Sequence, residues 1–383
     1  MNDLGFDKHP GYAVLKGLAD AGHQAFAVGG PVRNALMGLP IDDLDIATSA
    51  EPTVVMKWAE AHGFKAVPTG IDHGTITVVS GHEGIEVTTF RRDVATDGRR
   101  AVVAFSDSIE EDARRRDFTM NALYVDVQGV LHDPLNGMPD LKARRVRFID
   151  DPAQRIREDY LRILRFFRFF AWYGDPGLGI DADGLSACAE LADGLETLSK
   201  ERVGTELLKL LNAPDPSQAV ASMEQSGVLM RVLPAASANL LPVLVHLESE
   251  NGIVANPLRR LAALGDYDGA AHLRISKKQI IKLHNMETGL LEMLSPKEAG
   301  YRFGLETGRD IVLLQSAALE TPLDKAAFSD VDDGARSELP LRASDLPWLS
   351  GPALGVALKQ AEADWIASGL SLSKDALIAK SPK

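Results

Sequence analysis

Residues 25–50 (AFAVGGPVRNALMGLPIDDLDIATSA) constrain the fold more than any other stretch of this chain. The segment opens with four apolar residues, typical of a buried strand, which ends at Gly29 and Gly30. Pro31 suits the first position of a helix, because its fixed φ and missing N–H are both tolerated there. Acidic and apolar residues then alternate over residues 43–47, a period of two that predicts a second strand. The stretch therefore predicts a strand–turn–helix–strand unit.

The second predicted strand carries two carboxylates, Asp43 and Asp45, side by side on the face opposite its apolar residues. Neighbouring carboxylates repel each other unless a cation lies between them, and Mg²⁺ takes one or two carboxylates together with phosphate oxygens. The backbone N–H groups of Gly29 and Gly30, before a helix N-terminus, suit phosphate, and Arg33 adds further donors. This combination predicts a nucleotidyl-transfer site with bound Mg²⁺.

Length and composition bound the class of protein. A chain of 383 residues exceeds what a single core usually holds, so two or more domains are expected. The single cysteine, Cys188, excludes an internal disulfide and a cysteine zinc site. No apolar run reaches transmembrane length, and the first residues contain neither a basic nor an apolar leader. These features predict a cytoplasmic enzyme without a membrane partner.

The charge distribution limits the contact with nucleic acid. A net charge of -13 argues against a protein that coats nucleic acid, because phosphate contacts need basic residues. Between residues 91 and 168, however, 16 Lys and Arg accompany 14 Asp and Glu, against 25 and 40 in the rest of the chain. A locally basic middle in an acidic chain suits an enzyme that contacts one end of an RNA.

Periodicity and turn signals predict the next elements. Helices are expected over residues 1–24 and 51–62, strands over 65–67, 75–79 and 85–90, and a hairpin over 123–126 and 130–132. Residues 91–108 lack clean periodicity and contain Asp97-Gly98, a turn signal, which predicts an exposed, mobile loop. Glu86 lies between apolar neighbours of one strand, where it either approaches the metal or has a structural hydrogen-bonding role.

Two further segments carry charged side chains at informative spacings. Residues 114–122 read RRRDFTMNA, in which Asp117 is a plausible N-cap for a short helix. A helix beginning near Pro152 is expected to carry Asp159, Arg162 and Arg165 on one side. The acceptor of Asp and the donors of Arg would together match the base edges shared by C and A, while rejecting U and G. The alternative is an ordinary Asp–Arg pair on a helix surface.

The motifs GGPVRNALMG, DDLDIATSA and RRDFTMNA resemble those of the class II branch of the polymerase β-type nucleotidyltransferases, which contains CCA-adding enzymes and bacterial poly(A) polymerases. Glu158-Asp159-x-x-Arg162 is similar to the base-reading motif of that family. The resemblance implies that Arg116 binds the triphosphate, and that Asp117 and Asn121 either contact the ribose or support the local structure. It also implies that Arg165 and Arg168 continue the nucleotide contacts.

One residue departs from the family pattern, because Asn34 occupies a position that is usually Asp. The resemblance implies an α+β fold with a small polymerase β-like nucleotidyltransferase head, followed by an all-helical neck, body and tail. The expected boundaries are 1–145 for the head, 146–211 for the neck, including a helix capped by Ser199, and 212–383 for the body and tail. Helix breaks in the last part are expected at Pro214, Pro234, Pro242, Pro296, Pro340 and Pro352.

The implied activity is the addition of C, C and A to the 3′ end of tRNA from CTP and ATP, by two-metal chemistry without a nucleic-acid template. The helical body would hold the tRNA acceptor arm, and the loop over residues 91–108 would help the change from C to A. Two alternatives remain open from the sequence: a bacterial poly(A) polymerase, and a catalytically inactive relative that binds RNA or nucleotides.

Overall fold

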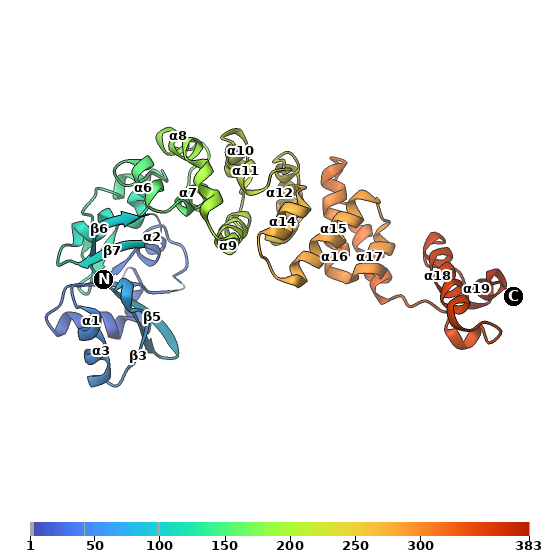
Figure 1. Ribbon diagram of the computed structural model, residues 1–383, viewed down its shortest axis with the longest axis horizontal. Helices are drawn as coiled ribbons and strands as arrows, with labels where there is room; N and C mark the ends of the chain where they lie inside the picture. The colour runs from blue at the N-terminus through green and yellow to red at the C-terminus, as the bar shows by residue number, and fades with distance from the viewer. Residues whose placement is uncertain (1–3, 42, 98–99, 383) are drawn as a thin grey trace. The chain divides into compact units, whose positions relative to one another are not determined.

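The computed structural model describes residues 4–41, 43–97 and 100–382. The chain divides into two compact units (Figure 1): Met1–Leu198 with Gln225–Arg231, and Ser199–Glu224 with Val232–Lys383. All described strands belong to the first unit, and every described element after residue 132 is a helix. The α+β fold expected from the sequence is therefore confirmed.

A seven-stranded sheet forms the centre of the first unit, in the order β3-β4-β5-β2-β1-β8-β9. Strands β2 and β5 are parallel, and all other neighbours are antiparallel. The expected strands and the expected hairpin are confirmed, with small differences at their ends. The bounds are β1 (Ala25–Val28), β2 (Ile46–Thr48), β3 (Lys65–Gly70), β4 (Thr75–Ser80), β5 (Glu83–Thr89), β8 (Tyr124–Asp126) and β9 (Leu131–His132).

The second predicted strand is shorter than its sequence pattern suggested. Strand β2 begins at Ile46, because its pairing with β1 ends where Ile46 lies opposite Ala27. Asp43 and Asp45 therefore precede the strand. The alternation itself is confirmed, since Leu44 and Ile46 are each 1% exposed while Asp43 is exposed.

Helices α1 and α3 pack together against the sheet. A Cβ at Gly17 of α1 would lie 2.2 Å from the ring of Trp58 in α3, so only glycine permits this contact. Helix α1 begins at Tyr12, so the helix predicted over residues 1–24 was too long, and residues 1–3 lie outside the described residues. The helices of this unit are η1 (Phe6–Lys8), α1 (Tyr12–Asp20), α2 (Gly30–Leu36), α3 (Pro52–Ala61), η2 (Ile71–His73), α4 (Ile109–Arg114), η3 (Thr119–Asn121), α5 (Met138–Lys142), α6 (Pro152–Glu158), α7 (Leu161–Tyr173), α8 (Ala182–Glu190) and η4 (Ala192–Thr197).

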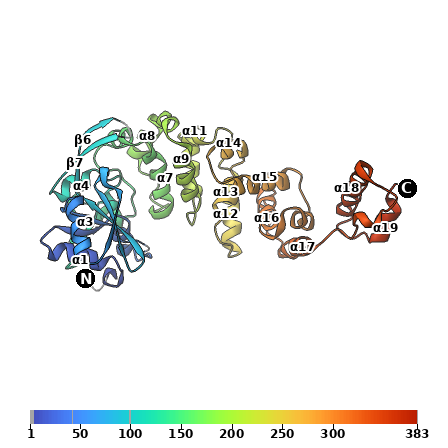
Figure 2. The ribbon, with the colours of Figure 1, turned by 60° about the horizontal axis from the view of Figure 1, so that its bottom comes forward.

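The segment predicted as a loop after residue 91 is a hairpin. Strands β6 (Arg91–Asp97) and β7 (Arg100–Phe105) pair antiparallel in a separate two-stranded sheet, which Figure 2 shows beside the large sheet. The prediction was wrong because Asp97-Gly98, which it treated as a loop turn, is also a strong hairpin signal between β-forming residues. Gly98 itself lies outside the described residues.

The second unit is built from helices, beginning with α9. Ser199 lies at the N-cap position of α9 as expected, although its side chain accepts no capping hydrogen bond. The end of α10 and most of α11 belong to the first unit. The helices from α9 onward are α9 (Lys200–Leu211), α10 (Ser217–Gln225), α11 (Val228–Val232), α12 (Leu240–Glu250), α13 (Pro257–Ala262), α14 (Tyr267–His272), α15 (Lys277–Leu291), α16 (Pro296–Ala318), α17 (Lys325–Arg336), η5 (Ala343–Asp345), α18 (Gly351–Ala367) and α19 (Lys374–Lys380).

The prolines of the second unit act in two ways. Pro214, Pro234 and Pro340 lie between helices, as predicted. Pro242, Pro296 and Pro352 instead lie in the first turns of α12, α16 and α18, where the missing N–H would have no partner within the helix. The predicted breaks at these three positions are therefore helix beginnings.

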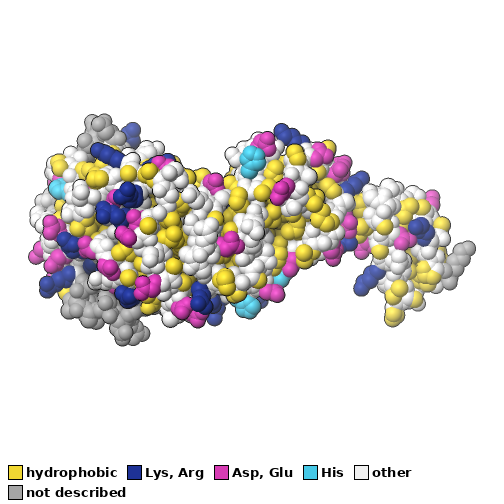
Figure 3. All heavy atoms as spheres, turned by 90° about the horizontal axis from the view of Figure 1, so that it is seen from above, with side chains coloured by type: hydrophobic (Ala, Val, Ile, Leu, Met, Phe, Trp, Pro, Cys, Tyr) yellow, Lys and Arg dark blue, Asp and Glu magenta, His cyan; other side chains and the backbone are white. Residues whose placement is uncertain are grey.

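The described surface has mixed charge. On the face seen in Figure 3, dark blue basic side chains and magenta acidic ones are interspersed rather than separated into two areas. Of the helices within the described ranges, none combines the length and the apolar character that a bilayer crossing requires.

Candidate active site

A cavity of about 260 Å³ lies where the large sheet meets the end of α4. Its lining combines carboxylates with arginines, which suits a metal and an anionic substrate together. Two of the lining carboxylates are Asp45, which directly precedes β2, and Glu86 of β5. The full lining is Val28, Asp45, Ile46, Glu86, Thr88, Arg91, Asp112, Arg115 and Arg116.

The register of the parallel strands β2 and β5 places Asp45 and Glu86 together. Ile46 of β2 lies opposite Val87 of β5, so Asp45 and Glu86 occupy corresponding positions one residue earlier. The main-chain oxygen of Asp45 accepts a hydrogen bond from the N–H of Val28 (3.0 Å), which fixes its backbone beside β1.

The surroundings of Asp45 disfavour the charged form of its carboxyl group. Burial, followed by the neighbouring charges of Glu86 and Asp43, raises the pKa of Asp45 to about 6, against the opposing effect of Arg116. Carboxylate oxygens are hard ligands that suit a divalent cation, and a cation bound at Asp45 and Glu86 would relieve this repulsion. Asp43 is exposed and does not line the cavity, and no group of three His, Cys, Asp or Glu side chains within the described ranges is already arranged around a metal position.

The glycine turn brings the start of α2 against an arginine. Gly29 has φ 75° and ψ -126°, and a Cβ there would lie 3.2 Å from Nη1 of Arg116. Gly30 then begins α2, with Pro31 in its first turn as predicted. Glycine at position 29 therefore permits both the backbone conformation and the close approach to Arg116.

Arg116 is held by two partners that sequence reasoning did not assign to the site. Its Nε donates to the hydroxyl of Tyr124 (3.0 Å), and its Nη2 donates to Asp112 (3.1 Å). Burial opposes the charge, but Tyr124 and Asp112 outweigh it and hold the pKa of Arg116 above its usual value. Asp112 and Arg116 are four residues apart across the end of α4, and this spacing is the sequence signal that could have identified the pair.

Arg33 binds protein groups within the first unit. It is 5% exposed, and it donates to the side-chain oxygens of Asn121 (2.6 Å), Asn34 (2.8 Å) and Tyr173 (2.8 Å). Its guanidinium also lies 3.8 Å from the centre of the Tyr173 ring. Burial lowers the pKa of Arg33 to about 10. Arg33 thus joins α2 to the end of α7, a role that no local sequence pattern indicated.

Asp117 connects the same region to α7. One of its oxygens accepts from the Phe118 N–H (2.9 Å) and from Asn121 (3.0 Å), and the other accepts from Nε of Arg165 (2.8 Å). Although burial opposes ionisation, Arg165 and Asn121 lower the pKa of Asp117 to about 2. The predicted N-cap role was wrong, because η3 begins after Phe118 and lacks a side-chain cap.

The helix predicted to carry the base-reading residues is interrupted at Asp159. Helix α6 ends at Glu158, Asp159 is extended (φ -154°, ψ 107°), and α7 begins at Leu161. The Asp159 side chain accepts from the Leu161 N–H (3.1 Å), a local bond that competes with a continuous helix. The expectation that Asp159 shares one helix face with Arg162 was therefore wrong.

The arginines of α7 are oriented by neighbouring groups. Arg162 donates to Glu158 (2.5 Å) and to the main-chain oxygens of Arg155 (2.8 Å) and Arg115 (2.9 Å). The Arg168 guanidinium lies 4.7 Å from the centre of the Phe169 ring. The acceptors around Arg162 fix its position beside Asp159 at the start of α7.

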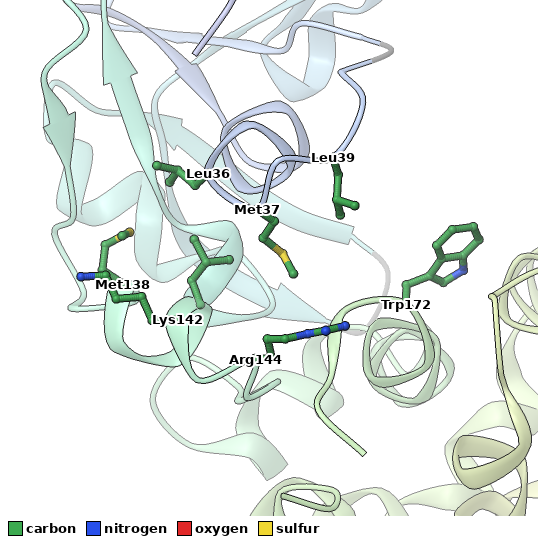
Figure 4. A pocket seen from close by; sticks show the side chains of 8 residues that line it. Leu36, Met37, Leu39, Met138, Lys142, Arg144 and Trp172 are labelled. Carbon is green, nitrogen blue, oxygen red and sulfur yellow. The ribbon is translucent and has the colours of Figure 1, made fainter. Parts of the chain in front are cut away.

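A different, mainly apolar cavity of about 360 Å³ lies beside the contact between α2 and α7. In Figure 4, the side chain of Arg144 extends towards the helix that carries Trp172, and Met37 points into the space above it. The walls of this cavity include Leu36 and Met37, which lie one helical turn after Arg33. The cavity contains none of the predicted site residues.

Comparison with known proteins identifies the family. The family model described as the Poly A polymerase head domain matches residues 25–147, and the model described as a probable RNA and SrmB-binding site of polymerase A matches residues 177–240. The mitochondrial CCA tRNA nucleotidyltransferase 1 of Mus musculus is 32% identical over 377 residues, which cover 94% of this chain and 87% of the mouse protein. The chain belongs to the CCA tRNA nucleotidyltransferase family.

Other members of the CCA tRNA nucleotidyltransferase family agree with this assignment. The CCA-adding enzyme of Streptococcus gordonii is 42% identical over 218 residues, covering 56% of this chain and 53% of that protein. The crystal structure of the Bacillus stearothermophilus CCA-adding enzyme in complex with CTP is 28% identical, with a TM-score of 0.77 over 95% of this chain and 93% of that one. Nucleotidyltransferases of this kind use divalent metal ions.

Proposed function

We propose that this enzyme adds C, C and A to the 3′ end of tRNA from CTP and ATP, without a nucleic-acid template and with release of pyrophosphate. The observation that carries the proposal is the single cavity lined by Asp45, Glu86 and Arg116, because nucleotidyl transfer needs metal ligands beside a triphosphate site. The names of the relatives, and the complex of the Bacillus stearothermophilus enzyme with CTP, support these substrates.

Asp43 and Asp45 are the proposed catalytic residues and metal ligands, with Glu86 as a third carboxylate. The raised pKa of Asp45 supports a site that is completed by a cation, and oxygen ligands favour Mg²⁺. When bound, Mg²⁺ lowers the pKa of the primer hydroxyl and orients the triphosphate. The primer hydroxyl gives up its proton to solvent and its oxygen forms a bond to the α-phosphorus, as the bond between that phosphorus and the oxygen of the leaving pyrophosphate breaks.

Arg116 and the backbone of Gly29 and Gly30 are the proposed triphosphate contacts. The partners of Arg116 keep it charged and oriented before the substrate arrives, which reduces the cost of ordering it. Arg33 and Asn121 would act together, since their hydrogen bond (2.6 Å) sets the position of the Asn121 amide near the nucleotide. Asn34 accepts a hydrogen bond from Arg33, as the family's usual Asp could.

Asp159 and Arg162 are the proposed base-reading pair. Asp159 would accept from the amino group of C or A, and Arg162 would donate to the adjacent ring nitrogen. Hydrogen bonds to protein groups support this pairing, because Asp159 is held by the Leu161 N–H and Arg162 by Glu158 and the main-chain oxygen of Arg115. Arg165, Arg168 and Asp117 would complete the nucleotide site along α7.

The remaining parts of the proposal concern the whole chain. We assign the head to residues 1–145, the neck to 146–211, and a body and tail that bind the tRNA acceptor arm to 212–383. The β6–β7 hairpin would help the change from C to A, so that a complete CCA end is made. The proposed location of this enzyme is the cytoplasm, whereas the mouse relative is named mitochondrial.

The test is incubation of the purified enzyme with tRNA that lacks its CCA end, one labelled NTP at a time and then CTP with ATP. Addition of two C and one A is expected. An untemplated run of A would indicate a poly(A) polymerase, and no incorporation would indicate an inactive relative. No observation in the described residues favours either alternative.

A further inference from the structure

A second charged cavity, of about 270 Å³, shares Arg115 with the active-site cavity. Four arginines line it, Arg92, Arg114, Arg115 and Arg155, together with the acidic residues Glu111 and Asp150. Because Arg155 also pairs with Glu158, which lies outside the lining, an excess of one positive charge remains. None of these residues is among the proposed catalytic or nucleotide-binding groups.

The local structure divides each arginine run between the two cavities. Arg91 and Arg92 are successive residues of β6, whose side chains point to opposite faces, and Arg91 lines the active site while Arg92 lines the second cavity. At the end of α4, Arg116 lines the active site and Arg114 the second cavity. A cavity with balanced charge and an arginine-rich cavity therefore lie side by side and share Arg115.

The acidic residues leave part of this positive charge available. Arg114 bonds to both oxygens of Asp150 (3.0 and 3.1 Å), but their side chains are 55% and 57% exposed, and exposed ion pairs contribute little. Glu111 accepts from the hydroxyl of Ser106. An anion with several oxygens could replace Asp150 at Arg114 and reach Arg92 as well.

One arginine of the cavity is buried, whereas Arg92 and Arg114 are exposed. Arg155 is 7% exposed, and it donates to the main-chain oxygen of Arg114 and pairs with Glu158. Glu158 in turn accepts from Arg162 of the proposed base-reading pair (2.5 Å). The cavity is therefore connected to the proposed nucleotide site through the buried Arg155 and through Glu158.

We propose that this arginine cavity binds a phosphate group other than the triphosphate of the incoming nucleotide. Forked arginine donors suit phosphate oxygens, and the surplus positive charge favours an anion. The inference rests on the proposed function, which supplies two sources of such a group. One is the backbone of the tRNA 3′ end, and the other is the pyrophosphate released in each addition.

The test compares Arg92→Ala/Arg114→Ala with the control Arg145→Ala/Arg157→Ala, which removes the same charge from exposed arginines outside the cavity. Each protein is assayed for tRNA affinity at several salt concentrations, KM for CTP, and inhibition by inorganic pyrophosphate. Thermal denaturation checks that both variants are folded, and Arg92→Ala alone serves if the double variant is not.

If the source is tRNA, the cavity variant should bind tRNA about tenfold more weakly, while the KM for CTP stays unchanged. The slope of the logarithm of the tRNA binding constant against the logarithm of the salt concentration should also become shallower by about one. If the source is pyrophosphate, tRNA affinity should be retained and the pyrophosphate inhibition constant should rise about tenfold. The inference is overturned if neither quantity differs from the control by more than about twofold. A wild-type enzyme without CCA addition would instead refute the proposed function, and pyrophosphate binding could still be measured by calorimetry.

Discussion

The ion pair between Asp117 and Arg165 should stabilise the contact between the segment joining α4 to η3 and helix α7. Asp117 is 7% exposed, and its pKa of about 2 lies below the value of 3.8 for an ordinary Asp. That difference corresponds to about 2 to 3 kcal/mol, at about 1.4 kcal/mol for each pKa unit. Replacing Arg165 by Met should remove this stabilisation and leave a buried carboxylate without its main counter-charge.

The stabilisation by this ion pair should depend on pH. Because the folded-state pKa of Asp117 is depressed, its stabilisation is fully present above about pH 4 and is lost as the pH falls through about 2. In Arg165→Met, burial would raise that pKa instead, so the loss of stability should grow as the pH rises from about 3 to 7. Asp117→Asn should suppress this growth.

The assay is a double-mutant cycle of Asp117→Asn and Arg165→Met, measured by hydrogen exchange of the β1 amides so that it reports on the first unit alone. A coupling free energy of about 2 to 3 kcal/mol is expected at pH 7. Arg168→Met is the matched control on the same helix, where the guanidinium lies over the Phe169 ring, and it should cost less than about 1 kcal/mol. A coupling below about 0.5 kcal/mol at pH 7 would refute the reasoning.

Three further predictions concern activity. Asp45→Ala should lower turnover by several orders of magnitude while circular dichroism stays unchanged, and near-normal CCA addition with Mg²⁺ would show that the metal assignment is wrong. Deletion of residues 95–104 should retain CC addition and abolish the terminal A, whereas equal loss of both would make the hairpin purely structural. Asp159→Ala and Arg162→Ala should each reduce the preference for C and A over U and G by about ten- to a hundredfold, measured with each of the four NTPs. Unchanged selectivity with weaker tRNA binding would assign this region to RNA phosphate instead.

The sequence by itself determined the strand–turn–helix–strand unit and the family. Gly29 and Pro31 act through local backbone geometry, and the burial of Leu44 and Ile46 follows from their alternation with the acids. Such features depend on neighbouring residues alone, so pattern reasoning recovered them. It also selected Asp45 and Arg116, which the structure brings into one cavity.

Only the tertiary structure decided how those residues are held. Arg33 bonds to Tyr173, 140 residues away, and Asp117 bonds to Arg165, 48 residues away, so no local pattern could reveal either contact. The helix breaks at Asp159 because the Asp159 side chain accepts a hydrogen bond from the Leu161 N–H. The spacing of apolar residues gives no sign of such a bond between a side chain and the backbone. Periodicity describes which face of a segment is apolar, whereas the partners of a buried charge are set by the segments that folding brings beside it.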